Sequence, residues 1–202
     1  MGLWVAKEPL VLASASEVRR GILSAAGIPL ETVPAGIDER GIVQRRRARD
    51  PGRIASLLAR EKALAIAAKL PDRLVLGADQ TLALGSEVFS KPLDIAGARA
   101  QLRRLRGKTH ALHSAIALAR GGSLLFKQRA VARLTVRDFS DAFLETYLAA
   151  AGSAVTASVG AYQVETLGIH LFDKIAGEHF AILGLPLLRL LEFLRREGFL
   201  AA

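Results

Sequence analysis

The sequence of 202 residues contains no cysteine. This absence excludes a disulfide scaffold, a thiolate metal site and a thiol nucleophile, and it suits a reducing compartment, so we expect a cytoplasmic protein. The sequence also lacks any window of about 18 apolar residues, the length a transmembrane helix requires. Its apolar run at 10–15 is too short for the core of a secretory signal. We therefore expect neither a signal peptide nor a membrane partner.

Aromatic residues make up only 5% of the chain, and acidic residues are outnumbered by basic ones, 19 to 28, for a net charge of +9. Such a charge predicts an anionic partner, which can be a phosphate ligand, a nucleic acid or a membrane surface. Five arginines cluster at positions 45, 46, 47, 49 and 53 without an interleaved aromatic residue. Base stacking is therefore disfavoured, nucleic acid is not the expected partner, and we expect the cluster to be solvated surface.

Hydrophobic residues make up 51% of the chain, which excludes a disordered protein, and the length predicts a single domain over residues 1–202. Short apolar runs alternate with helical patterns that carry recognisable start and stop residues. Strands are predicted at 9–13, 30–33, 73–78, 110–119, 123–136 and 169–175, with a hairpin at 81–89. Helices are predicted at 17–26, 51–70, 95–105, 141–151 and 186–197, and irregular segments at 36–52 and 152–168. This mixture predicts an α/β fold with a partly antiparallel sheet and flanking helices.

Hydroxyl and guanidinium groups gather where the first strand meets the first helix. The residues are Ser14, Ser16, Arg19 and Arg20. A helix N-terminus presents unpaired N–H groups and a positive dipole end, so hydroxyls and arginines there suit a phosphate group. An ordinary serine N-cap beside a solvated helix face is the more frequent explanation of such a pattern. The pattern alone leaves both interpretations open.

Two acidic residues occupy positions at which a carboxylate needs an ion-pair or hydrogen-bond partner, or else has a functional role. Glu61 falls inside the apolar stripe of the predicted helix 51–70, and Lys62 lies on the flank of that stripe. Glu61 is therefore either buried with a functional role or exposed to solvent at the edge of the stripe. Asp79 follows the most apolar strand, and we expect it at the carboxyl end, where open α/β sheets bind ligands. There it can hold a divalent cation or activate water, or it can cap the turn.

Weaker candidates complete the set. Glu39 is one of two adjacent carboxylates in a loop, and Lys91 is a cation beside a rigid proline turn. His110 and His113 are three residues apart, which places them on opposite faces of a strand and disfavours a paired metal site. Cations and helix N–H groups for phosphates, with carboxylates for a metal and a water, are typical of phosphoryl transfer or phosphate hydrolysis.

Short motifs follow one another along the chain. They are LASAS at 12–16 before paired arginines, DE at 38–39, AREKA at 59–63, GAD at 77–79, KP at 91–92, RGKTH at 106–110, GAY at 160–162, ETLG at 165–168 and GLP at 184–186. Each motif is weak alone, but in this order and at this spacing they resemble the Maf family of nucleoside triphosphate pyrophosphatases, from about residue 10 to residue 198.

The resemblance implies a fold like that of inosine triphosphatase, with an elongated mixed sheet, two lobes around a cleft, and commonly a homodimer. It implies hydrolysis of nucleoside triphosphates to the monophosphate and pyrophosphate with a divalent cation, Mg²⁺ or Mn²⁺. Carried over to this sequence, phosphate and substrate contacts fall to Ser14, Ser16, Arg19 and Arg20. Lys62 and Lys91 neutralise the triphosphate, whereas Glu39 and Asp79 serve the metal and the attacking water, with Asp79 as the base.

Positions that differ between branches of the family favour the branch that acts on 7-methyl-GTP. The arginine pair at 19–20, Gln80 and Glu165 match that branch, and we expect Gln80 and Glu165 to bind substrate. Val18 departs from it, because that branch carries a tryptophan there, and a flat aromatic suits a cationic purine. Two alternatives stay open. One is a dTTP/UTP pyrophosphatase, and the other is a nucleic-acid-binding or division-related protein, supported by the charge and the arginine cluster.

Overall fold

The computed structural model describes residues 2–201. The strands are β1 (Leu10–Leu12), β2 (Leu30–Thr32), β3 (Val75–Leu84), β4 (Glu87–Phe89), β5 (Thr109–Arg120), β6 (Ser123–Val136) and β7 (Phe172–Ala176). The helices are α1 (Glu17–Ala25), α2 (Glu39–Arg45), α3 (Pro51–Ala67), α4 (Ile95–Leu105), α5 (Asp141–Ala151), α6 (Ala154–Ala157), α7 (His179–Ile182) and α8 (Leu187–Arg196). Two 3₁₀ helices, η1 (Val159–Ala161) and η2 (Leu167–Leu171), precede β7.

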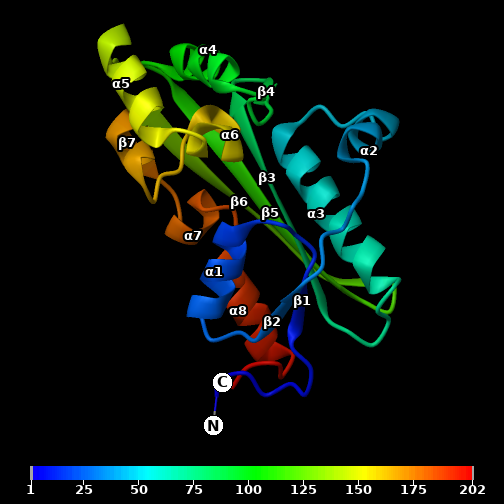
Figure 1. The fold of residues 1–202 in the computed structure, drawn as a ribbon. Coiled ribbons are helices and arrows are strands. Elements are labelled where there is room, and N and C mark those ends of the chain that lie inside the picture. Colours follow the sequence, from blue (N-terminus) through cyan, green and yellow to red (C-terminus); the bar gives the residue numbers. More distant parts are fainter. Residues whose placement is uncertain (1, 202) are drawn as a thin grey trace.

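All seven strands form one mixed sheet with the order β2-β1-β3-β5-β6-β7, and β4 pairs with the far end of β3. The pairs of β1 with β2 and with β3 are parallel, whereas the other pairs are antiparallel. The long strands β3, β5 and β6 run along the elongated molecule, with helices around them (Figure 1). The predicted α/β fold with a partly antiparallel sheet and flanking helices is confirmed.

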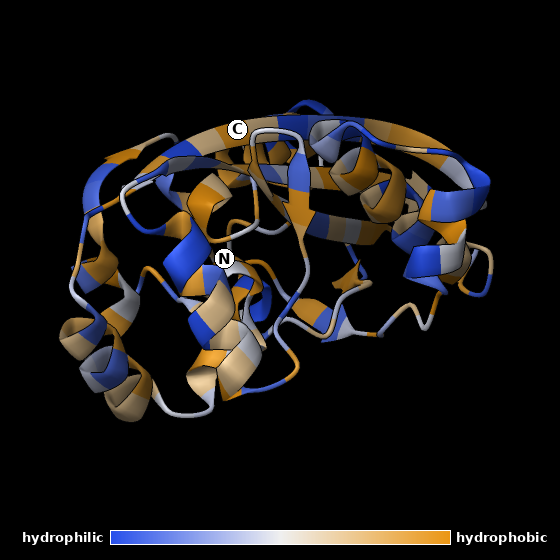
Figure 2. Cartoon of the chain, turned by 90° about the horizontal axis from the view of Figure 1, so that it is seen from above, coloured by the Kyte–Doolittle hydropathy of each residue, from blue (hydrophilic) through white to orange (hydrophobic). Residues whose placement is uncertain are grey.

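One face of the sheet carries two hydrophobic cores. Leu76 and Leu82 point to this face of β3, since they are an even number of residues apart. Leu76 belongs to the proximal core, formed with α1 and α8, and Leu82 belongs to the distal core, formed with α4, α5 and α6. The two groups of helices cover opposite ends of the long strands (Figure 1). These strands mix hydrophobic and hydrophilic residues along their length (Figure 2).

Helix α3 covers the opposite face of the sheet with small side chains. Its buried alanines pack on alanines of β5, and Gly77 of β3 meets the helix backbone. A Cβ atom at Gly77 would overlap the Ala59 carbonyl oxygen and lie 2.6 Å from the Ala63 nitrogen. Because position 77 has no side chain, α3 and β3 approach each other closely.

Most predicted elements are confirmed, including the helix starts. Ser16, Asp50 and Ser140 accept hydrogen bonds from the first turns of α1, α3 and α5, as N-caps do. The hairpin between β3 and β4 and the long pair β5–β6 also form as expected. His113 and His110 lie on opposite faces of β5, as predicted from the spacing.

Three predictions about local structure are wrong. The strand expected at 169–175 begins only at Phe172, because the residues before it form the 3₁₀ helix η2. The segments expected to be irregular contain the short helices α2 and α6, which are too brief for a periodic pattern to show. The predicted break between residues 78 and 81 does not exist, because β3 continues through Asp79 in register with β5 up to Ala83. Polar side chains at 79–81 resemble a strand end in the sequence, but pairing along β5 keeps the backbone extended.

Within residues 2–201, none of the helices has both the length and the apolar character needed to cross a bilayer. The two ends of the described chain meet, since Trp4 bridges to Leu200 and its ring stacks on Phe199.

Candidate functional site

A gap in the sheet positions the candidate site. On one edge, β3 pairs with β1 at Val75 and Leu76 and with β4 from Leu82 onward. Among the described residues, no strand pairs with this edge of β3 in between. Ser14, which follows β1, and Asp79, in the middle of β3, both lie at this gap and are both buried, with 7% exposure each. Asp79 was expected at the end of its own strand and is instead beside the end of β1.

Lys62 joins two carboxylates at the gap. Its Nζ atom donates a hydrogen bond of 2.7 Å to Asp79 Oδ1 and lies 2.8 Å from Glu39 Oε1. The three side chains come from α3, β3 and the first residue of α2, and the close approach of α3 at Gly77 brings Lys62 within reach of Asp79. Asp79 and Lys62 are largely buried, whereas the Glu39 side chain is half-exposed. The contacts bring Glu39, Lys62 and Asp79 together, which their separation along the sequence does not predict.

The protonation of Asp79 is set by opposing influences. Burial raises the pKa of its carboxyl group, while Lys62 and then Arg19 act to lower the same pKa. A buried carboxylate with a raised pKa beside fixed cations is typical of a group that accepts a proton or holds a ligand.

Arg19 closes the gap from the side of α1. Its Nη1 atom donates to Ser14 Oγ at 3.1 Å and to Ala78 O at 3.0 Å, and its Nε atom donates to Gly184 O at 3.0 Å. Burial lowers the pKa of the guanidinium, and the nearby carboxylates of Asp79 and Glu39 oppose this change. Arg19 therefore satisfies a carbonyl that the interrupted sheet leaves open, and it supplies positive charge beside Asp79.

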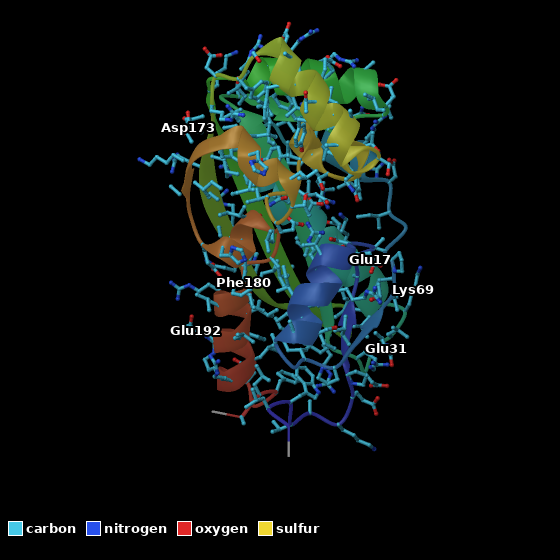
Figure 3. All side chains as sticks on the ribbon, turned by 60° about the vertical axis from the view of Figure 1, so that its left-hand side comes forward. Glu17, Glu31, Lys69, Asp173, Phe180 and Glu192 are labelled. Carbon is cyan, nitrogen blue, oxygen red and sulfur yellow. The ribbon has the colours of Figure 1, made fainter. Side chains whose placement is uncertain are left out.

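The other residues predicted for the site make no hydrogen bond or ion pair with Glu39, Lys62 or Asp79 within the described residues. Ser16 is the N-cap of α1, with Oγ accepting from Arg19 N at 3.4 Å. Arg20 pairs with Glu17 and lines a surface hollow of about 830 Å³ beside Trp4. Figure 3 labels Glu17 at the start of α1. Lys91 and Glu165 are exposed, and no hydrogen bond or ion pair within residues 2–201 joins either to the cluster. Their predicted roles in the site stay predictions.

Gln80 points to the opposite face of β3 from Asp79, because the two are adjacent in a strand. Its amide donates to protein oxygens there: Ser114 Oγ at 2.9 Å, Ile182 O at 2.9 Å and Ala181 O at 3.3 Å. Sequence reasoning missed Ser114 and the carbonyl of Gly184. The GLP motif at 184–186 was the available signal for the second, and a buried serine in an alanine-rich strand was a faint signal for the first.

Glu61, the other carboxylate that the sequence singled out, contacts the guanidinium of Arg60 at 3.3 Å and is one-quarter exposed. It lies at the wet edge of the α3 stripe. The five arginines of the cluster at 45–53 are all exposed, as predicted.

The described residues contain no group of three or more histidine, cysteine or acidic side chains that could hold a metal ion by themselves. A cation at this site would need oxygen ligands from a bound molecule in addition to Glu39 and Asp79.

Fold and site together define a mixed α/β protein in which two carboxylates and two largely buried cations converge at a gap in the sheet. The chain belongs to the Maf-like protein family, which it matches over residues 9–197.

Relatives extend over the whole chain. A nucleoside triphosphate pyrophosphatase of Rhodopseudomonas palustris (strain BisB18) is 57% identical over 201 residues, covering 100% of both chains. A 7-methyl-GTP pyrophosphatase of Brucella abortus biovar 1 is 47% identical over 190 residues, covering 93% of this chain and 96% of that protein. A HAM1 protein structure from Coxiella burnetii matches 65% of this chain and 74% of its own with a TM-score of 0.44 and 16% identity, which is too slight for any argument.

Proposed function

We propose that this protein is a nucleoside triphosphate pyrophosphatase. The reaction adds water to the α-phosphorus of a nucleoside triphosphate and breaks the bond to the bridging oxygen, so that a nucleoside monophosphate and pyrophosphate leave. Support comes from relatives of that name at 50–57% identity over the full chain. The observation that carries the proposal is the contact of Lys62 Nζ with both Asp79 and Glu39 at the gap in the sheet.

Each charged group at the gap has a role that its surroundings favour. Asp79 is the proton acceptor for the attacking water, because burial raises its pKa and Lys62 fixes its carboxylate. Lys62 and Arg19 neutralise charge on the triphosphate, and the partial burial of both side chains strengthens this electrostatic effect. Ser14 orients a phosphate oxygen from its place beside Arg19. We assign Ser16, Arg20 and Lys91 to the outer part of the triphosphate path.

The side chains at the gap fit a divalent cation. Glu39 and Asp79 each contact Lys62 through one carboxylate oxygen, and within residues 2–201 their other oxygens, Glu39 Oε2 and Asp79 Oδ2, have no hydrogen bond or ion pair, so one oxygen of each can bind a cation. Carboxylate oxygens are ligands for Mg²⁺ and Mn²⁺, and Mg²⁺ is commonly held by one or two carboxylates together with substrate phosphates. We propose that Glu39 and Asp79 hold this cation. When bound, it supplies further neutralisation of phosphate charge.

For the base, we propose a preference for 7-methyl-GTP over dTTP and UTP. Glu165 supports it, since a carboxylate can accept hydrogen bonds from a guanine edge and offset the charge of a methylated ring. The relative of that name in Brucella abortus supports it as well. Val18 argues for a shallow preference, because a missing aromatic stack gives up about 1–3 kcal/mol per base. A dTTP/UTP pyrophosphatase is the competing assignment.

The test is pyrophosphate release from a panel of 7-methyl-GTP, GTP, dTTP and UTP, with and without a chelator, and with Asp79→Asn as the control for contaminating phosphatases. The proposal requires pyrophosphate with a nucleoside monophosphate in equal amounts, and loss of both with the chelator. Release of orthophosphate alone, or no release from any nucleotide, contradicts it. The second outcome leaves nucleic-acid or division-related binding through the exposed arginine cluster as the function to pursue.

The same panel applied to two variants tests the base preference. Glu165→Gln is expected to shift the kcat/KM ratio toward dTTP and UTP, and Val18→Trp is expected to sharpen the preference for 7-methyl-GTP. A wild type that prefers dTTP or UTP contradicts the assignment, as do variants that leave the ratios unchanged.

We also propose that the enzyme works in the cytoplasm, where nucleoside triphosphates are made and used, and that it acts as a homodimer. Light scattering during gel filtration measures the second property directly, and a monomer at working concentration contradicts it.

A further inference from the structure

Residues 177–186 cross from one hydrophobic core to the other. This crossing segment leaves β7, forms the short helix α7 and leads into α8. Ile182 packs in the distal core, whereas Leu185 is fully buried in the proximal core. Figures 1 and 3 both show α7 between β7 and α8, and Phe180 of α7 is labelled in Figure 3. The segment therefore ties the two halves of the molecule together beside the middle of β3.

The carbonyls at the end of α7 are held by buried side chains of the sheet. A helix C-terminus leaves its last carbonyl groups without partners inside the helix. Here Gln80 Nε2 donates to Ile182 O at 2.9 Å and to Ala181 O at 3.3 Å, and Ser114 Oγ donates to Ala181 O at 2.6 Å. Gln80 also donates to Ser114 Oγ at 2.9 Å. The end of α7 is thus attached to β3 and β5 by a connected set of hydrogen bonds.

A second attachment follows at Gly184. Arg19 donates to its carbonyl at 3.0 Å and to the Ala78 carbonyl at 3.0 Å. Gly184 has a φ of +92°, and a Cβ atom there would lie 3.3 Å from Arg19 Nη2. The left-handed backbone and the close approach of the guanidinium both favour glycine at this position.

These two attachments involve the residues immediately before and after Asp79 in the sequence. Its preceding residue Ala78 is held through the carbonyl, and its following residue Gln80 is held through the side chain. Both lead to the same crossing segment. The backbone is therefore held at residue 78 and at residue 80, immediately before and after Asp79, whose own side chain contacts Lys62.

We propose that Gln80 is a positioning residue for Asp79 in the hydrolysis and is not a reader of the base. The proposal rests on the proposed function. Gln80 acts by holding the crossing segment against β3, with Ser114 as its partner, so that Asp79 stays within reach of Lys62. Its amide donates to protein oxygens on the face of the sheet away from Asp79, which is not the geometry of a group that contacts the nucleotide.

The test replaces Gln80 with methionine, which has a similar length but cannot form these hydrogen bonds. We expect kcat to fall between about 10- and 100-fold, the loss that a small displacement of a reacting group produces. The fall should be equal for 7-methyl-GTP, GTP, dTTP and UTP, with KM within about twofold of wild type, because uniform loss of kcat reflects geometry rather than binding. Gln128→Met is the matched control, since the Gln128 amide donates to the neighbouring Arg129 carbonyl on β6, and it should retain wild-type kinetics.

Amide hydrogen exchange provides a readout that does not depend on activity. Gln80→Met should speed exchange in residues 181–185 relative to wild type and to Gln128→Met. Ser114→Ala removes one member of the same hydrogen-bonded set, and it should show a smaller loss of kcat with the same equal pattern across nucleotides. If Gln80→Met does not fold, Ser114→Ala alone decides the question.

Outcomes separate this inference from the proposed function. A wild type that releases no pyrophosphate overturns the proposed function. An active wild type with unchanged kcat in Gln80→Met overturns the positioning role alone. A loss that differs between purine and pyrimidine nucleotides, or that appears in KM, identifies Gln80 as a reader of the base and also overturns the inference.

Discussion

The molecule buries two polar clusters that are built on opposite principles. At the gap in the sheet, Asp79, Lys62 and Arg19 are charged groups that stabilise one another. In the distal core, His110 Nε2 and the Tyr162 hydroxyl share a hydrogen bond of 2.6 Å, and burial keeps both groups neutral. Burial lowers the pKa of His110 to about 4, and it raises the pKa of Tyr162.

This difference leads us to assign the cluster at the gap to function and the His110–Tyr162 pair to stability. Buried charges that converge at the edge of an interrupted strand are an arrangement that suits an anionic ligand, whereas a neutral pair surrounded by packed side chains suits a fixed core. We therefore expect changes at the gap to affect turnover, and changes at His110 to affect the free energy of unfolding.

The largest expected effect is on Asp79. Asp79→Asn keeps the shape of the side chain but cannot accept a proton, so turnover should fall by about 10²-fold or more, the scale of a lost general base. Binding of a non-hydrolysable nucleotide should persist. Pyrophosphate release and calorimetric binding measure the two quantities. Turnover within a few-fold of wild type would show that Asp79 is not catalytic. The cluster at the gap would then not be distinguished from the His110–Tyr162 pair by a role in turnover.

Loss of either buried cation should be the next largest effect. Lys62→Ala and Arg19→Ala should each raise the activation free energy by about 1.5–3 kcal/mol, the range for hydrogen bonds to charged groups. The measurement is kcat/KM for the preferred nucleotide. Arg19→Ala should also weaken folding, since Arg19 satisfies the carbonyls of Ala78 and Gly184, so a thermal melt accompanies the kinetics.

The pH dependence of folding should identify the neutral cluster. The pKa of His110 is about 4 in the folded protein and about 6.5 when unfolded, so the unfolded state binds more protons between these values. This contribution to stability is complete above pH 6.5 and is lost as the pH falls toward 4. From pH 7 to pH 5, wild type should lose about 2 kcal/mol more unfolding free energy than His110→Gln, since one unit is about 1.4 kcal/mol.

Urea unfolding at the two pH values measures this difference. The exposed histidine His170, replaced by glutamine, is the matched control and should lose as much stability as wild type. Equal pH dependence in wild type and His110→Gln contradicts the assignment. A fall in turnover at pH 7 for a folded His110→Gln breaks the separation between the two clusters.

The smallest expected effect is at the exposed arginine cluster. Arg46→Ala should change kcat/KM by less than about twofold, because solvated surface charges contribute little and are screened by salt. A loss as large as that of Lys62→Ala places the phosphate site at α2 and overturns the location proposed here.

Local sequence signals predicted much of the fold and part of the site. Capping serines and aspartates marked the starts of helices, and long alternating or apolar runs marked β5 and β6. The same signals failed at β3, where polar residues at 79–81 are held in the sheet by a partner strand that is more than 30 residues away in the sequence. A short-range pattern contains no information about such a partner.

The resemblance to a family supplied candidate residues for the site, but it did not supply their contacts with one another. Lys62 and Asp79 are 17 residues apart, and Arg19 and Gly184 are 165 residues apart, so their contacts depend on the completed packing. Gln80 is the clearest case of a residue whose contacts could not be predicted from its place in a motif. Its neighbour in the sequence is Asp79, yet the alternation of the strand sends its side chain to the other face.

The close contact of α3 with Gly77 has a consequence for how this sequence tolerates mutation. Since the backbone of the helix occupies the space where a side chain would begin, even alanine at position 77 would push the helix that carries Lys62 away from the strand that carries Asp79. In a saturation library selected for activity, we expect position 77 to reject every replacement as firmly as position 79. A residue with no side chain would thus be recorded as essential.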